Sequence, residues 1–192
     1  MKYDVLIIGG GLAGLRAAIE AKKAGATSAV LSMVYPIRSH SVAAQGGINA
    51  ALCNAPDGKE DTWEKHAFDT VKGSDFLADQ KAVETLTREA IPTLYELESW
   101  GAPFSRLDDG KIAQRPFGGA AFPRTCYAED RTGHNLLHTL YQQCLRNEVE
   151  IMNEWMLLEL IVKDDICQGA VVMNLKSGDI STVAAKSVIL AT

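Results

Sequence analysis

The sequence lacks the features that define several large classes of protein. No run of apolar residues approaches the roughly 18 that a membrane-spanning helix needs. Charge of one sign is not concentrated anywhere, because 19 Lys and Arg residues and 24 Asp and Glu residues are interspersed along 192 residues, with a net charge of −5. Since nucleic-acid-binding proteins carry basic patches, we expect no nucleic acid partner.

Cysteine is also scarce, and the four that occur form no recognisable metal-binding pattern. Cys53, Cys126, Cys144 and Cys167 include no C-x-x-C pair. The spacing indicates neither a zinc nor an iron–sulfur site, so free thiols and no metal are expected. No signal or transit peptide is indicated, since the first apolar run begins at Tyr3. Together these features predict a cytoplasmic protein.

The stretch with the clearest chemical meaning is a glycine-rich turn between an apolar run and a helix-forming segment. The turn comprises Gly9, Gly10, Gly11, Leu12, Ala13 and Gly14. Residues 3–8 before it are typical of a strand buried on both faces, and residues 15–24 after it favour a helix that ends at Gly25. Gly9, Gly11 and Gly14 have the G-x-G-x-x-G spacing that binds a pyrophosphate at a helix N-terminus. A glycine turn with a purely structural role is the alternative.

The elements that follow predict an α/β fold, Rossmann-like, with a parallel sheet and an antiparallel β-meander. A second strand is expected at 28–31 and ends at Ser32, where the lack of an acidic residue is atypical of a plain NAD site. The meander is expected from β runs at 150–153, 156–162, 170–174 and 183–184. Residues 187–192 are expected to form a buried strand that rejoins the first sheet.

Three helices are expected, at 61–71, 79–99 and 133–147. Asp61 or Thr62 is the expected N-cap of the first helix, and Asp79 is the expected N-cap of the second, which ends at Gly101. In the second, Pro92 predicts a break or a second start. The expected apolar face of this second helix comprises Val83, Leu86, Ile91, Leu94 and Leu97. Two segments without periodicity, 33–58 and 102–131, are rich in small residues and are expected to contact a large flat ligand.

Several stretches occur in the order in which one family of flavoproteins has them. Besides Gly9–Gly14, they are R-S-H-S at 38–41, A-A-Q-G-G-I at 43–48, D-T-V-K-G-S-D at 69–75, Q-R-P-F-G-G at 114–119 and D-R-T-G-H at 130–134. The chain resembles the flavoprotein subunit of succinate dehydrogenase and fumarate reductase over essentially its whole length. Residues 1–192 are therefore expected to be the N-terminal part of an FAD-binding domain. A chain that ends on a strand is expected to be part of a longer protein.

The resemblance implies FAD as the cofactor and names the residues that contact it. His40 matches the family histidine that is joined covalently to the flavin. The other implied FAD contacts are Gly9, Gly10, Gly11, Leu12, Ala13, Gly14, Ser32, Ser39, Ser41, Ala44, Gln45, Gly46 and Gly47. Gln45 and Phe117 match positions near a dicarboxylate substrate. The remaining histidines, His66, His134 and His138, are interpreted as structural.

The resemblance implies interconversion of succinate and fumarate by hydride transfer to or from covalently bound FAD. It implies an iron–sulfur subunit and a membrane anchor as partners, which would hold the protein on the cytoplasmic face of the inner membrane. The family's catalytic arginine lies beyond Thr192, so no catalytic residue is expected within the chain, and residues 1–192 alone are expected to be inactive. The direction of the reaction stays open, since Arg124-Thr125-Cys126-Tyr127 resembles some bacterial fumarate reductases.

Two alternative functions are considered. An aspartate oxidase-like flavoenzyme would bind FAD without a covalent bond, and that branch lacks a histidine at the position of His40. A nucleotide-binding module without a redox role would need only the glycine turn. The Gln45-Gly46-Gly47 stretch and the length of the loop around it favour a flavoprotein over such a module. Met33 replaces the lysine often found after the family serine, which weakens the ribose contact assigned to Ser32.

Overall fold

The computed structural model describes all residues from Met1 to Thr192, and the chain divides into two compact units. The first unit comprises residues 1–42 and 136–192, and the second comprises residues 43–135. Each unit contains a β-sheet of its own, with six strands in the first and three in the second. None of the helices is both long and apolar enough to cross a membrane.

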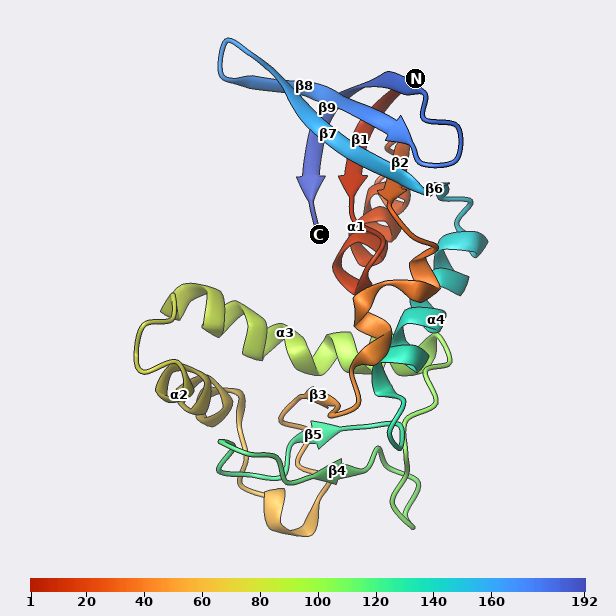
Figure 1. The fold of residues 1–192 in the computed structure, drawn as a ribbon. Coiled ribbons are helices and arrows are strands. Elements are labelled where there is room, and N and C mark those ends of the chain that lie inside the picture. The colour runs from red at the N-terminus through yellow and green to blue at the C-terminus, as the bar shows by residue number, and fades with distance from the viewer. The chain divides into compact units, whose positions relative to one another are not determined.

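The sheet of the first unit combines a parallel half and an antiparallel half in the order β6-β2-β1-β9-β8-β7 (Figure 1). Its strands are β1 (Lys2–Ile8), β2 (Ser28–Ser32), β6 (Glu150–Asn153), β7 (Trp155–Lys163), β8 (Ile166–Asn174) and β9 (Ile180–Leu190). The pairs from β6 to β9 are parallel, and the pairs from β9 to β7 are antiparallel. The predicted α/β fold, with a parallel sheet and a meander, is confirmed.

Strand β9 joins the two halves, and this differs from the prediction of two separate strands. Residues 180–190 form one continuous strand, in which Val188 pairs with Leu6 of β1 and Val183 pairs with Ala170 of β8. The predicted return to the first sheet is confirmed, but the predicted burial is wrong at its end. Ile189 is 39% exposed and Leu190 is 60% exposed.

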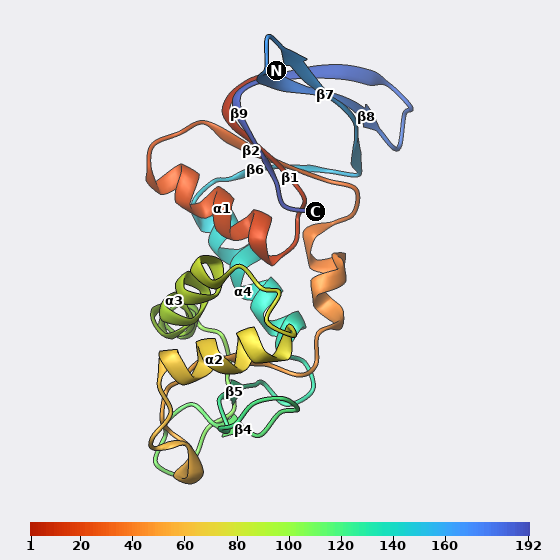
Figure 2. The same cartoon turned by 90° about the vertical axis from the view of Figure 1, so that its left-hand side faces the viewer.

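Helix α1 (Leu12–Lys23) covers the sheet of the first unit (Figure 2). It buries Leu15 and Ile19 completely, which anchors the turn that precedes it to the sheet. The helix ends as predicted, since Gly25 follows the C-cap with a left-handed φ of 78°. Residues 136–146 of α4 (Thr132–Arg146) also belong to this unit, and Leu137 and Cys144 on them are fully buried.

The second unit is built from two packed helices, α2 (Trp63–Gly73) and α3 (Gln80–Ser99), and a small antiparallel sheet (Figure 2). The strands are β3 (Ile48–Asn49), β4 (Gln114–Arg115) and β5 (Thr125–Cys126), in the order β3-β5-β4. A short 3-10 turn lies at Pro56–Gly58 in this unit, and two others, Pro36–Arg38 and His40–Ala43, lie where the first segment of the first unit ends. These short elements occupy segments expected to be irregular, because two residues are too few to show a strand period.

Helix α3 is continuous through Pro92, so the predicted break is wrong. The helix loses one backbone hydrogen bond there but keeps its packing, since Leu94 and Leu97 beyond the proline are buried. The predicted apolar face is also wrong at Leu86, which is 60% exposed. Thr87 is buried in its place, and its hydroxyl donates to the Val83 carbonyl, so a threonine satisfies its own polar group on the packed face.

Candidate functional site

A cleft of about 830 Å³ lies in the first unit, where β1 and β2 end. Clefts of this size hold cofactors or small ligands, and the carboxyl ends of parallel strands are their usual place. Nine of the predicted FAD contacts line it, namely Gly9, Gly10, Gly11, Leu12, Ala13, Ser32, Ser39, His40 and Ser41. Met156 and Leu157 of β7 also line the cleft, and the sequence offered no signal for them because their position depends on the sheet order.

Two glycines of the turn, Gly9 and Gly14, are required by close backbone contacts. Gly9 has a φ of 118°, and a Cβ atom there would lie 2.2 Å from the Ala191 carbonyl oxygen. A Cβ at Gly14 would lie 1.9 Å from the Gly9 carbonyl oxygen. Gly14 does not line the cleft, so its part is to let α1 pack against the turn.

The N-terminus of α1 faces the cleft and is suited to bind an anion. Its N-cap, Gly11, makes no side-chain hydrogen bond, and no acidic residue occurs in the first turn. The N–H groups of Leu12 and Ala13 therefore have no partner within the helix and add to the positive end of its dipole. This arrangement fits the pyrophosphate of a dinucleotide such as FAD.

Polar side chains around the cleft add groups that could bind a ligand. The Ser39 hydroxyl oxygen is buried without a hydrogen-bond partner in the protein, which fits a polar ligand at this point. The Ser32 hydroxyl donates to the Val34 carbonyl over 2.6 Å, so its oxygen can still accept a bond. His40 begins a short 3-10 turn, lines the cleft and is exposed.

The remaining predicted site residues, Ala44, Gln45, Gly46, Gly47 and Phe117, belong to the second unit. The ring of Phe117, 53% exposed, packs on Gly46, where a Cβ would lie 3.0 Å from its Cζ atom. Arg115 donates to the carbonyl oxygens of Gln45 over 3.1 Å and Gly46 over 2.5 Å. The guanidinium group of Arg115 also lies 4.4 Å from the ring centre of Tyr127, which fixes its position.

The chain was compared with families of known proteins. A family model described as "FAD binding domain" matches residues 4–192. The chain belongs to this family of FAD-binding domains. This membership agrees with the glycine turn, the uncapped helix and the buried Ser39 hydroxyl around the cleft, so FAD is the cofactor of the domain.

Curated and solved relatives of the FAD-binding domain carry the predicted family names. The succinate dehydrogenase flavoprotein subunit of Rickettsia felis is 48% identical over 100% of this chain and 33% of its own length. The fumarate reductase flavoprotein subunit of Mycobacterium tuberculosis is 45% identical over 100% of this chain and 32% of its own length. The predicted resemblance is confirmed, and the chain spans about a third of the length of these relatives.

Solved structures show the same fold as this FAD-binding domain. A variant of the E. coli quinol fumarate reductase flavoprotein superposes with a TM-score of 0.94 at 40% identity, over 100% of this chain and 32% of that one. Mycobacterium smegmatis Sdh1 in complex with UQ1 has a TM-score of 0.96 at 37% identity, over 100% of this chain and 34% of that one. The described residues therefore form a fold known from larger flavoproteins.

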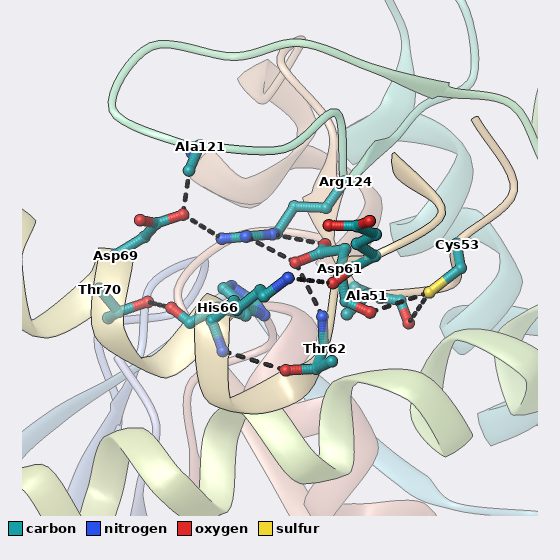
Figure 3. A network of polar contacts seen from close by, with 12 residues as sticks. Ala51, Cys53, Asp61, Thr62, His66, Asp69, Thr70, Ala121 and Arg124 are labelled. Atoms are coloured by element: carbon teal, nitrogen blue, oxygen red, sulfur yellow. Dashed lines mark hydrogen bonds and ion pairs between the residues drawn. The ribbon is translucent and has the colours of Figure 1, made fainter. Parts of the chain in front are cut away.

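A buried ionic network stabilises the second unit of the FAD-binding domain (Figure 3). The Arg124 side chain is 1% exposed and makes two bonds to Asp61, from Nε over 2.9 Å and from Nη2 over 2.8 Å. Its Nη1 atom donates to Asp69 over 2.7 Å. Burial disfavours the charged guanidinium, but the hydrogen bonds and charges of Asp61 and then Asp69 outweigh burial and raise the pKa of Arg124. The sequence indicated Asp61 only as a possible helix cap, whereas Thr62 is the N-cap.

His66 lies beside this network, and we predict that it makes the stability of the second unit depend on pH. The ring is 6% exposed, and its Nδ1 atom has no hydrogen-bond partner. Burial, followed by the positive charge of Arg124, lowers the pKa of His66 below its usual 6.5. The unfolded chain therefore takes up a proton first, so stability is complete above pH 6.5 and decreases as the pH falls below that value.

This prediction is checked by urea unfolding between pH 5 and pH 8, followed by tryptophan fluorescence. The His66→Gln variant should lose part of the decrease in midpoint that the natural protein shows at acid pH. Asp75→Asn, which replaces an exposed acid after α2, serves as a control for general changes in charge. Equal pH dependence in the natural protein and in His66→Gln would show that His66 does not contribute.

Two of the four cysteines are poor nucleophiles. Burial raises the pKa of Cys126 and of Cys144 to about 12, so both remain protonated thiols at neutral pH. All four cysteines are free in the structure, as the sequence predicted. Cys126 lies in β5 and pairs with Ile48 of β3 and with Gln114 of β4, so it has a structural role in the small sheet.

Proposed function

We propose that this FAD-binding domain is part of a succinate dehydrogenase or fumarate reductase flavoprotein subunit. In this proposal the whole protein interconverts succinate and fumarate, and FAD is attached covalently through His40. The observation that carries it is that His40 and the uncapped N-terminus of α1 line the same cleft. A nucleotide whose phosphates bind at the helix would then have a nucleophilic ring nitrogen within the same site.

In this proposal each polar group of the cleft binds a different part of the cofactor. The N–H groups of Leu12 and Ala13 would hold the phosphates, and the Ser32 hydroxyl oxygen would accept a hydrogen bond from a ribose hydroxyl. The unpartnered Ser39 hydroxyl would bind a polar atom of the cofactor. The flavin, when bound, supplies the two-electron redox chemistry, for which the protein provides orientation and charge.

Two residues of the second unit, Gln45 and Phe117, are proposed to bind the substrate. Gln45 offers an exposed amide, and Phe117 offers a half-exposed ring held on Gly46. An amide and an apolar wall suit a short dicarboxylate, whose carboxylates accept hydrogen bonds and whose carbons are apolar. The arginine that would move the proton is proposed to lie outside residues 1–192, in the other two thirds of the protein.

The proposed partners are an iron–sulfur subunit and a membrane anchor, which would hold the protein at the cytoplasmic face of the inner membrane. The names of two solved relatives support a quinone as the distant electron partner. One is Sdh1 in complex with UQ1, and the other is a quinol–fumarate reductase with menaquinol molecules. Electrons would pass from the flavin through the iron–sulfur subunit to the quinone, or in the opposite direction.

The proposal is tested on the full-length protein by its intact mass after denaturation and by succinate-dependent reduction of a dye. A mass increment equal to FAD less the two hydrogens lost in forming the bond, together with turnover, is the expected result. A yellow protein that releases its flavin on denaturation and does not oxidise succinate would favour an aspartate oxidase-like enzyme. A colourless protein without an adduct would contradict both enzymatic assignments.

A further inference from the structure

The carboxylate of Asp69 on α2 connects two parts of the second unit (Figure 3). Its Oδ2 atom accepts a bond from Nη1 of Arg124 over 2.7 Å and from the backbone N–H of Ala121 over 2.9 Å. The Asp69 side chain is 12% exposed, so its bond to Arg124 is partly buried, whereas its bond to Ala121 lies at the surface. One side chain therefore ties a helix to the backbone of a segment 52 residues later in the chain.

The segment that Asp69 holds is residues 116–123, which make up most of the loop that joins β4 to β5. Phe117 stands at its start and Ala121 near its end. Between them lie Gly118 and Gly119, which are exposed and add no side-chain contacts. Such a loop has little intrinsic stiffness, since glycine leaves the backbone many conformations. The Ala121 bond is consequently well placed to restrict where the loop, and Phe117 with it, can lie.

The charge balance of the network indicates that Asp69 is not needed to neutralise Arg124. Asp61 already faces the guanidinium with two bonds and is itself buried, with a side chain 1% exposed. A second carboxylate leaves the group of three with one negative charge in excess, and burying an excess charge is costly. The bond to Ala121 gives Asp69 a second role, because the oxygen that accepts from Arg124 also accepts from the loop backbone.

We propose that Asp69 is a positioning residue, which holds the 116–123 loop so that Phe117 stays packed on Gly46. Asp69 does not touch substrate in this proposal. It acts through Phe117, whose ring forms the apolar wall for a dicarboxylate, and this step rests on the function proposed above. A loop released from Asp69 would leave the ring mobile and weaken dicarboxylate binding more than it slows the chemical step.

The experiment uses the full-length protein with Asp69→Asn, Asp75→Asn as the matched control, and Phe117→Ala alone and combined with Asp69→Asn. Asp75 follows α2, is exposed and has a φ of 51°, which asparagine also adopts. Hydrogen exchange of peptides that cover 116–123 reports the loop directly, without reference to activity. Steady-state kinetics with succinate or fumarate separate KM from kcat.

In Asp69→Asn, exchange of the loop should rise by about tenfold and KM by about tenfold, the size expected for one charge-assisted hydrogen bond. The value of kcat should change less than about threefold. Asp75→Asn should match the natural protein in both measurements. In the Phe117→Ala background, Asp69→Asn should still loosen the loop but should no longer raise KM, because the group through which it acts is gone.

Unchanged loop exchange in Asp69→Asn would overturn the proposal, and so would equal KM effects with and without Phe117. If Asp69→Asn fails to fold, Ala121→Pro replaces it, since proline removes the N–H donor and leaves the Asp69–Arg124 ion pair in place. It should give the same increases in exchange and KM. If the natural protein turns over no dicarboxylate, the proposed function fails, while the exchange measurement still decides whether Asp69 holds the loop.

Discussion

Replacement of His40 by alanine is expected to abolish the covalent attachment of FAD while the flavin still binds in the cleft. The imidazole is the proposed nucleophile, and alanine offers no atom that could form the bond. The cleft itself should persist, because His40 is exposed at its edge and the α1 N-terminus and the serine hydroxyls are unchanged. The denatured natural protein should be heavier than its sequence by the mass of one FAD less two hydrogens, one lost from the imidazole and one from the flavin as the bond forms, and the denatured variant should have the sequence mass.

The natural protein and the variant are compared by intact mass and by the visible spectrum before and after denaturation. His138→Gln serves as the matched control, since His138 is a histidine of the same chain that does not line the cleft, and it should retain the adduct. A variant that keeps the full adduct would move the attachment to another residue. A natural protein without any adduct would contradict covalent binding altogether.

Replacement of Arg124 by methionine is expected to destabilise the second unit by about 3 to 5 kcal/mol, the usual cost of removing one partner of a buried ion pair. Asp61, 1% exposed, would keep a buried charge and lose both of its bonds to the guanidinium. Asp69 would lose its bond as well. Since each step of about 1.4 kcal/mol is a factor of ten, this loss would raise the population in which residues 43–135 are open by roughly two to four orders of magnitude.

Peptide-resolved hydrogen exchange of the full-length protein checks this prediction, with fast exchange expected across residues 43–135 in Arg124→Met. The triple variant Arg124→Met, Asp61→Asn, Asp69→Asn is the control, because it removes the stranded charges together with the cation. It should recover most of the lost protection, since neutral groups cost less to bury than unpaired charges. Natural-like protection in the single variant would show that the network does not stabilise the unit.

The elements that the sequence predicted are those whose causes lie within a few residues of one another. Thr62 and Asp79 cap α2 and α3 through bonds to residues three positions later. Gly101 follows α3 with a φ of 99°, as its place after the helix predicted. Local hydrogen bonds and backbone preferences act over one turn of helix, so the residue order is sufficient to predict them.

The elements that the sequence did not predict depend on pairing between distant segments. Strand β9 was expected as two strands, because only its pairing with both β1 and β8 makes residues 180–190 continuous. Likewise β3, β4 and β5 are two residues long and exist as strands only through one another. The prediction placed Leu86 on the buried face of α3, whereas the structure buries Thr87 and exposes Leu86. The face that a helix buries is decided by the elements that pack against it.

The sequence by itself determined the chemistry of the cofactor site. The G-x-G-x-x-G spacing and the R-S-H-S stretch are local, and they predicted the family and FAD. Only the tertiary structure decided that Arg124, Asp61 and Asp69 of the second unit are buried together as an ionic network. Arg124 lies 63 residues after Asp61 and 55 after Asp69, and charged residues in a sequence predict an exposed surface. Folding removes water from all three together, and that shared burial turns them into one network.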